Sequence, residues 1–282
     1  MDDEQQRQAR SFGSVVEAYD RGRPGYPREA VEWLVGQDAV TVLEVGAGTG
    51  KLTQQLVELG HDVWATEPDE AMLDVLRKLL PDTRATVASA EDLPVPDRSV
   101  DVVVAGQCLH WFDLEKALPE IARVLRPGGH IAVVWNQRDE RIPWVRKLGA
   151  IIGTQDQLRD PADPLVQSGL FGFVDDARFK FWQEINRDSI QDLLLSRSNI
   201  ATLDEDARSA KLAELLAFYD DYGRGMDGMQ LPYDALCFRA VVVEPPRAAE
   251  EEPEDPSADE RDLDPGRPSD GTDTDMLLID FR

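Results

Sequence analysis

Three glycines alternate in the stretch EVGAGTGK, residues 44–51, directly after an apolar run. Glycines at this spacing let the backbone turn sharply and approach a ligand closely. The stretch is not a P-loop, because Val45 stands where the first glycine of that motif belongs and Leu52 replaces its Ser or Thr. A dinucleotide fingerprint is disfavoured too, since its third glycine would fall on Lys51. A ligand-binding loop and a plain tight turn between a strand and a helix stay open.

A single acid, Glu67, ends the next apolar run, 21 residues after Gly46. A carboxylate at this place can accept hydrogen bonds from both hydroxyls of a ribose. Taken alone, Glu67 is equally well explained as a solvated acid at a strand end. Together with the glycine loop, it favours a ligand that contains a nucleoside.

Strand-like and helix-like segments alternate around these residues. Apolar patterning predicts seven strands, over residues 40–45, 62–66, 84–88, 100–105, 130–135, 178–185 and 233–243. Helical periodicity is found over residues 51–59, 69–80, 114–125, 144–152, 164–170, 189–195 and 205–219. This order predicts an α/β fold, a doubly wound and mostly parallel sheet with helices on both faces. Such a sheet binds its ligand beyond the carboxyl ends of the strands, where the strand order reverses.

Four segments of the chain resemble motifs of one enzyme family. The loop has the form ExGxGxG, which resembles motif I of the class I S-adenosylmethionine-dependent methyltransferases. SAEDLPVPD at 89–97 resembles the segment of that family that lines the adenine, and SVDVVV at 99–104 resembles its fourth strand. LRPGG at 125–129 resembles the turn before its fifth strand. The likeness covers residues 41–135 and is to small-molecule enzymes of the ubiquinone-biosynthesis and trans-aconitate type.

The resemblance implies a Rossmann-like methyltransferase fold whose last strand, 233–243, is antiparallel. It implies S-adenosylmethionine as the cofactor, and residues 12–27 look like the N-terminal segment that covers it in such enzymes. One departure is Ser89, where many relatives carry an aspartate that binds the adenine amino group. The residues expected to bind the cofactor are Glu44, Gly46, Gly48, Gly50, Glu67, Pro68, Ala90, Glu91 and Gln107.

The methyl acceptor is expected beside the loops that follow the fourth and fifth predicted strands. Methyl transfer from a sulfonium is an in-line displacement, so the protein mainly orients two reactants and excludes water. A base is needed only when the acceptor holds its proton tightly. The candidate catalytic residues are His110, Trp111, Tyr19 and Asn136. A loop-fixing role for His110 and core packing for Trp111 stay open as alternatives, and Arg138, Arg21 and Arg23 are candidates to bind a polar or carboxylate acceptor.

The charge and composition of the chain limit the classes of partner that it can bind. With 55 acids against 30 bases and a formal net charge of −25, the chain lacks the basic surface that a nucleic-acid or anionic-membrane binder needs. No apolar run is long enough to span a bilayer, and the N-terminus MDDEQQRQAR is unlike a signal peptide, so we expect a cytoplasmic protein. Two cysteines and three histidines show no spacing typical of a metal site, and none is predicted. The expected partner is a small-molecule acceptor.

The chain is expected to divide into an N-terminal cap segment, 1–36, a methyltransferase domain, 37–244, and an acidic tail, 245–282. The tail is rich in acids and prolines and poor in apolar residues, which predicts disorder. Its last apolar patch, MLLIDF at 276–281, is either solvated or a short peptide that docks on a protein partner. Two other functions stay open, a nicotinamide-dependent oxidoreductase and a non-catalytic nucleoside-binding or interaction module.

Overall fold

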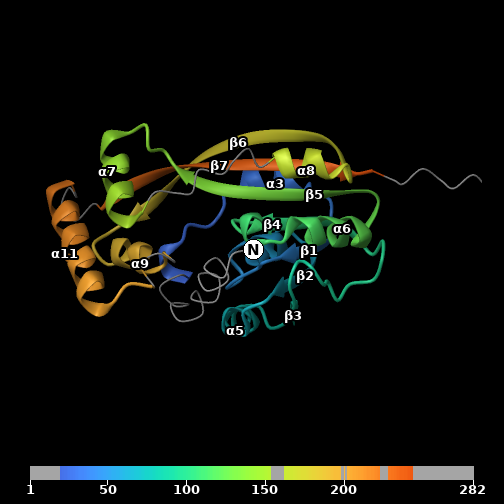
Figure 1. The fold of residues 1–282 in the computed structure, drawn as a ribbon, viewed down its shortest axis with the longest axis horizontal. Helices are drawn as coiled ribbons and strands as arrows, with labels where there is room; N and C mark the ends of the chain where they lie inside the picture. Colours follow the sequence, from blue (N-terminus) through green and yellow to red (C-terminus); the bar gives the residue numbers. More distant parts are fainter. Residues whose placement is uncertain (1–19, 154–161, 198–199, 201, 223–227, 244–282) are drawn as a thin grey trace, which may run out of the picture. The chain divides into compact units, whose positions relative to one another are not determined.

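A computed structural model describes residues 20–153, 162–197, 200, 202–222 and 228–243 (Figure 1). Tyr19 and the acidic tail at 245–282, both named above, lie outside the described residues. The described residues form a seven-stranded sheet with the order β3-β2-β1-β4-β5-β7-β6. Its strands are β1 Thr41–Val45, β2 Asp62–Glu67, β3 Arg84–Val87, β4 Val100–Gly106, β5 Leu125–Arg138, β6 Phe171–Ile185 and β7 Met229–Val242.

The pairing of the strands confirms a mostly parallel sheet with an antiparallel last strand. β1 to β5 pair in parallel with one another, and β7 runs antiparallel between β5 and β6. The chain winds outward from β1 to β3 on one side and from β4 onward on the other. The strand order therefore reverses between β1 and β4, which makes their carboxyl ends the place where such a sheet binds a ligand.

Helices cover both faces of this sheet. They are α3 Arg28–Val35, α4 Lys51–Glu58, α5 Glu70–Leu79, α6 Leu114–Val124, α7 Pro143–Ile152, α8 Ala162–Ser168, α9 Ser189–Leu195 and α11 Glu205–Tyr222, with a 3-10 turn, η2, at Leu109–Trp111. One apolar cluster joins α3 and α4 to β1, β4 and β5, and a second joins α6 and α8 to the opposite side of the same strands. A third cluster joins α7, α9 and α11 to β6 and β7 (Figure 1).

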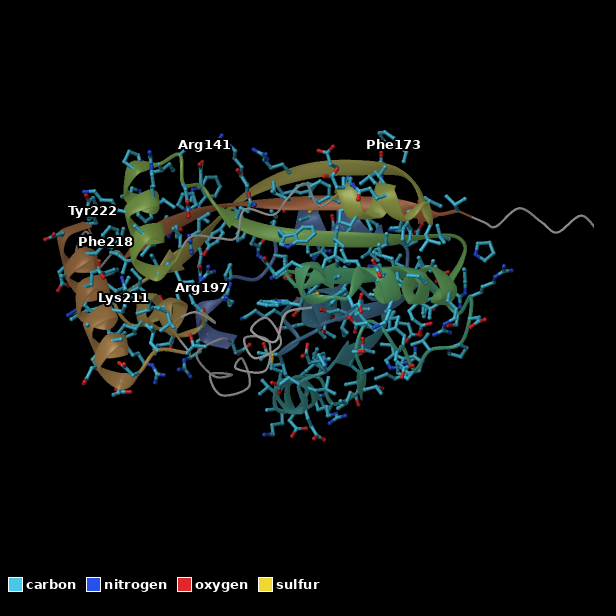
Figure 2. All side chains as sticks on the ribbon, in the orientation of Figure 1. Arg141, Phe173, Arg197, Lys211, Phe218 and Tyr222 are labelled. Atoms are coloured by element: carbon cyan, nitrogen blue, oxygen red, sulfur yellow. The ribbon has the colours of Figure 1, made fainter. Side chains whose placement is uncertain are left out.

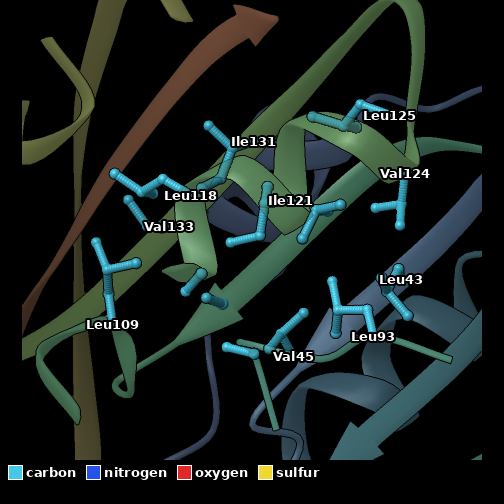
Figure 3. Close-up of a cluster of buried hydrophobic side chains, with 14 of the residues drawn as sticks. Leu43, Val45, Leu93, Leu109, Leu118, Ile121, Val124, Leu125, Ile131 and Val133 are labelled. Carbon is cyan, nitrogen blue, oxygen red and sulfur yellow. The ribbon is translucent and has the colours of Figure 1, made fainter. Parts of the chain in front are cut away.

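The apolar core beneath α6 anchors the loop that follows β4. Leu118 and Ile121 of α6 face Ile131 and Val133 of β5, and all four are almost fully buried (Figure 3). Leu109 of η2 belongs to the same cluster. The loop after β4 is therefore anchored in the core by an apolar side chain at its centre.

Several elements differ from the sequence prediction. β5 begins at Leu125 rather than 130, so the LRPGG segment expected as a turn belongs to this strand, and β7 begins at Met229 rather than 233. Residues 28–35, assigned above to the cap segment, form α3, whose Ala30 and Leu34 are fully buried against the sheet. Pro24 and Pro27 stand just before this helix and disfavour a helix in the sequence pattern. In the structure Pro27 is the N-cap residue, so neither proline lies inside the helix. β6 begins seven residues before the predicted strand, at Phe171 rather than 178, because its pairing with β7 continues through Asp175 and Asp176, whose charges interrupt the alternation.

Candidate active site

The glycine loop leaves β1 and enters α4 through three left-handed residues. Gly46, Gly48 and Gly50 have φ of 73°, 57° and 94°, a region that L side chains rarely adopt. The amides of Gly46 and Ala47 both donate to the Thr66 carbonyl, at 2.9 and 3.0 Å, which fastens the loop to β2. A Cβ on Gly46 would also lie 2.8 Å from the Cys108 sulfur. The loop is therefore held tightly against the ends of β2 and β4.

Glu67, the last residue of β2, supports this loop from the side. One of its carboxylate oxygens accepts from the Gly48 amide at 2.9 Å and the other from the Asp69 amide at 3.0 Å. Burial raises the pKa of Glu67, and these two amide hydrogen bonds oppose the rise. A carboxylate has about four lone-pair sites, so two amide bonds leave acceptor capacity for a ligand.

Glu44 is the second buried acid beneath the loop. Its side chain is 2% exposed and accepts a hydrogen bond from the Thr53 hydroxyl at 2.6 Å. Burial raises its pKa to about 8, against the lowering effect of the Thr53 bond. At neutral pH the Glu44 carboxyl therefore mostly keeps its proton and can donate as well as accept.

This proton makes stability depend on pH. Between about 4.5, the ordinary pKa, and about 8 the folded protein holds a Glu44 proton that the unfolded chain releases. The stabilising contribution is complete below the unfolded pKa and falls as the pH rises through the folded one. We expect the melting temperature of Glu44→Gln to fall less than that of wild type between pH 5 and 8.5. Exposed Glu58→Gln should follow the wild-type curve, and equal slopes for all three proteins would contradict the assignment.

An open cavity of about 630 Å³, part of it solvent at the mouth, lies over the carboxyl ends of β1, β4 and β5. Glu44, Gly46 and Gly48 line its first wall, and Gln107 and Asn136 line the wall beside β4 and β5. Gln107 has φ of 61°, a left-handed backbone that is unusual for a residue other than glycine. Strain of this kind clusters at binding sites. The cavity thus brings together five of the residues predicted for cofactor binding or catalysis. Arg23 and Arg138, predicted to bind a polar or carboxylate acceptor, line it as well.

Residues 20–27, here called the strap, close one side of the cavity. Asp20 accepts from the Thr49 hydroxyl at 3.0 Å, and the Asn136 side-chain amide donates to the Gly25 carbonyl at 3.0 Å. The Tyr26 amide donates to Gln55 of α4 at 3.2 Å. The strap therefore ties the glycine loop to the end of β5 across the cavity, and Asn136 serves both as lining and as its anchor.

The other described residues predicted for cofactor binding or catalysis lie outside the described lining of the cavity, as does Arg21, which pairs with Asp192 at 2.9 Å. Gly50 and Glu67 are not lining residues, although Glu67 accepts from the amide of the lining residue Gly48. Pro68 is exposed, and Ala90 is 3% exposed in the core. A Glu91 carboxylate oxygen accepts from the Asp113 amide at 2.8 Å, joining the segment after β3 to the loop after η2. His110 is exposed and its ring lies 4.6 Å from that of Trp111. The structure does not bring these two rings to the cavity wall.

Arg123 of α6 fixes the segment predicted to line an adenine. Its guanidinium donates to the carbonyls of Leu93 and Val95, at 3.1 and 2.9 Å, and to Asp97 at 2.7 Å. Glu120 holds the other edge of the same guanidinium at 2.7 and 2.8 Å. One side chain therefore sets the course of residues 93–97.

Loss of this clamp should cost stability. Arg123→Ala removes the donors of two backbone carbonyls and two carboxylates, so we expect the free energy of unfolding to fall by about 1–3 kcal/mol. Urea denaturation measures it. Lys116→Ala on the same helix removes only an exposed pair with Asp113 and should cost less than about 1 kcal/mol. Equal losses for the two variants would show that Arg123 is only a surface charge.

Three lining residues from the second half of the chain were not singled out from the sequence. Leu193 and Arg197 come from α9 and the turn after it, and Tyr233 comes from β7. Each lies far along the chain from the glycine loop, beyond the motifs that carried the resemblance. Nothing in their local pattern marks them, because α9 and β7 read as ordinary helix and strand. Tertiary contacts alone place them at the cavity.

Within the described residues, no helix is long and apolar enough to cross a bilayer. Among the same residues, no group of three or more His, Cys, Asp and Glu side chains is arranged to hold a metal ion.

Comparison with known proteins agrees with this geometry. Residues 43–133 match the model of the family described as "Methyltransferase domain". An uncharacterized methyltransferase of Mycobacterium tuberculosis is 45% identical over 237 residues, covering 83% of this chain and 96% of that protein. One from Schizosaccharomyces pombe is 34% identical over 236 residues, covering 80% and 94%.

A solved structure shares the fold. The "Putative Type II Methyltransferase" from Anaeromyxobacter dehalogenans is 25% identical, with a TM-score of 0.56 over 79% of this chain and 99% of that one. The family match, the full-length relatives and the order of the strands agree with the glycine loop and with Glu67 at the end of β2. The chain therefore belongs to the class I S-adenosylmethionine-dependent methyltransferases.

Proposed function

We propose that this enzyme methylates a small-molecule acceptor inside the cavity between the glycine loop and the ends of β4 and β5. The observation that carries the proposal is the continuity of that cavity. One wall consists of Glu44, Gly46 and Gly48, and the facing wall includes Gln107 and Asn136. A donor on the first wall and an acceptor on the second would meet within one space. The strap and α9 limit that space, which favours a small molecule over a polymer.

The residues present fit the methyl donor of the family. Gly48 lines the cavity, and a Cβ there would meet nothing closer than 3.9 Å, so its missing side chain leaves room for a ligand rather than for protein. Glu67 retains acceptor capacity beside it. We assign cofactor binding to Glu44, Gly46, Gly48, Gly50, Glu67, Pro68, Ala90, Glu91 and Gln107.

S-adenosylmethionine would supply an activated methyl group on its sulfonium sulfur. When the acceptor atom takes this methyl group, the remaining S-adenosylhomocysteine is the leaving group. The protein's part is to align the reactants and exclude water. Asn136, 3% exposed and bonded to the strap, is placed to orient an acceptor. Gln107 and the strap line the same space and would shield it from water.

The catalytic roles of His110 and Trp111 stay predictions, because both rings lie outside the described lining. A general base is worth about 10²–10⁴-fold in turnover. If His110 acts on the acceptor, His110→Ala loses turnover while keeping its affinity for S-adenosylhomocysteine. A turnover within twofold of wild type would remove His110 from the mechanism and leave positioning by Asn136.

Two measurements test the proposed function. Calorimetric titration should show binding of S-adenosylhomocysteine and none of NAD⁺ at the same concentration. Incubation of cell extract with methyl-labelled cofactor should place the label in the small-molecule fraction, and Gly48→Val should abolish that labelling. Label found only in protein or nucleic acid, or binding of NAD⁺ alone, would refute the proposal.

A further inference from the structure

Three arginines from three separate elements reach the same end of the cavity. Arg23 belongs to the strap and Arg138 is the last residue of β5. Arg197, labelled in Figure 2, follows α9. All three line the cavity beside Tyr233 of β7. The protein carries 55 acids against 30 bases, so this local excess of positive charge runs against its composition.

Arg138 is built into the wall rather than lying on the surface. Its side chain is 1% exposed, and one terminal nitrogen donates to the Gly153 carbonyl at 2.9 Å and to Glu140 at 3.2 Å. Burial lowers its pKa, and the charge of Arg23 lowers it further. The charges of Arg23 and Arg138 therefore repel each other in a partly dry site, and Glu140 pairs with Arg138. An anion between them would relieve that repulsion.

Tyr233 lines the cavity beside the three arginines, and the charges of all three act on its hydroxyl group. It pairs with Arg138 across β5 and β7 and stacks on Phe181 with ring centroids 5.2 Å apart. Burial raises the pKa of the Tyr233 hydroxyl, and the charges of Arg138, Arg23 and Arg197 oppose that rise. The hydroxyl thus keeps its proton and can donate a hydrogen bond at the same place.

The described residues lining the cavity are positive on balance. Arg23, Arg138, Arg197 and Lys51 face a single acid, Glu44. Glu44 is mostly protonated at neutral pH, since its pKa is about 8. Lys51 is offset by Asp20 of the strap at 3.6 Å, which leaves the arginine end as the positive one. Guanidinium forks match carboxylate and phosphate oxygens in pairs.

We propose that Arg23, Arg138, Arg197 and Tyr233 form a subsite that binds an anionic oxygen group of the methyl acceptor. This inference rests on the proposed function, because it names the class of molecule that the same cavity receives. Arg138 and Arg197 lie on the side of β5 and α9, across the cavity from the glycine loop. A methyl donor of this family carries one carboxylate, which one fork satisfies, so three forks exceed what the donor needs.

Arg197 offers the sharpest test, because Arg138 has structural hydrogen bonds and its loss could unfold the protein. Citrate and inorganic phosphate are titrated calorimetrically, at constant ionic strength, into protein saturated with S-adenosylhomocysteine. We expect at least one anion to bind wild type, and to bind Arg197→Gln about tenfold or more weakly, as for loss of one charge-assisted contact. Tyr233→Phe should weaken the same anion several-fold.

The control is Arg141→Gln. Arg141 is equally positive, pairs with Asp139 at 2.6 Å, and lies apart from Arg197 outside the described lining (Figure 2). Its anion affinity should equal that of wild type. Binding of citrate alone would indicate a carboxylate acceptor, and binding of phosphate alone a phosphorylated one. If neither anion binds wild type, or if Arg141→Gln and Arg197→Gln lose affinity equally, the subsite does not exist.

A second comparison separates the acceptor from the cofactor. S-adenosylhomocysteine carries the amino-acid carboxylate that 5′-methylthioadenosine lacks. If Arg197→Gln and Tyr233→Phe weaken the first about tenfold and leave the second unchanged, the arginines hold the cofactor and the inference is wrong. If wild type binds neither nucleoside, the proposed function fails. The anion titration without nucleoside then still tests the subsite by itself.

Discussion

Gly48→Val should lose all measurable binding of S-adenosylmethionine while the protein stays folded. A Cβ at this position meets no protein atom closer than the Met72 sulfur, at 3.9 Å, so the Cβ of a valine does not collide with the fold. Gly48 lines the cavity, however, and the added side chain occupies space that the ligand needs. Steric exclusion of this kind abolishes the affinity for the ligand, because the loop is hydrogen-bonded to β2 and cannot move the valine side chain aside.

Backbone strain is a second effect of the same change and must be separated from it. Valine at a φ of 57° costs about 1–3 kcal/mol of stability. Gly60→Val is the matched control. Gly60 has φ of 90°, a Cβ added there would meet no atom within 4 Å, and the residue lies outside the described lining of the cavity. We expect both variants to lose melting temperature and only Gly48→Val to lose cofactor binding in calorimetry. Retained binding in Gly48→Val would move the cofactor away from the glycine loop.

The sequence predicted the first half of the fold closely because its signals are local. β1, β2 and β4 are short and mostly buried strands; β2 ends at Glu67, β4 ends at Gly106, and β1 ends directly before Gly46. β3 is partly exposed and was found from its place between helix-like and strand-like segments rather than from burial. Each following helix shows one apolar face, as in α4, where Leu52 and Leu56 are buried. Burial on both faces makes such strands recognisable without any knowledge of their partners.

The second half was predicted less well because its structure depends on distant contacts. The bounds of β6 follow from its long pairing with β7, which local alternation does not reveal. The same holds for the site. The glycine loop and Glu67 can be recognised by their spacing in the sequence. Arg197 and Tyr233 reach the cavity only after β7 pairs with β5 and α9 packs on β7. A single sequence carries no signal that links residue 233 to residue 138.

Glu67→Ala should weaken S-adenosylmethionine binding by at least about 100-fold. Two ribose hydrogen bonds to a carboxylate are each worth about 1.5–3 kcal/mol, and each 1.4 kcal/mol is a factor of ten in affinity. The structure adds a second reason for a large effect. The same carboxylate accepts from the Gly48 amide at 2.9 Å, so its loss also frees the loop that the ligand contacts.

Two further variants assign the loss to its cause. Glu67→Gln keeps one acceptor oxygen and should support only one of the two amide bonds, so its affinity should fall between those of wild type and Glu67→Ala. Glu70→Ala, exposed at the start of α5, removes an acid nearby without touching the loop and should bind as wild type does. Adenosine, which keeps the ribose but lacks the methionine part, should lose affinity for Glu67→Ala by the same factor as S-adenosylhomocysteine. A loss confined to S-adenosylhomocysteine would place Glu67 at the methionine end and overturn the ribose assignment.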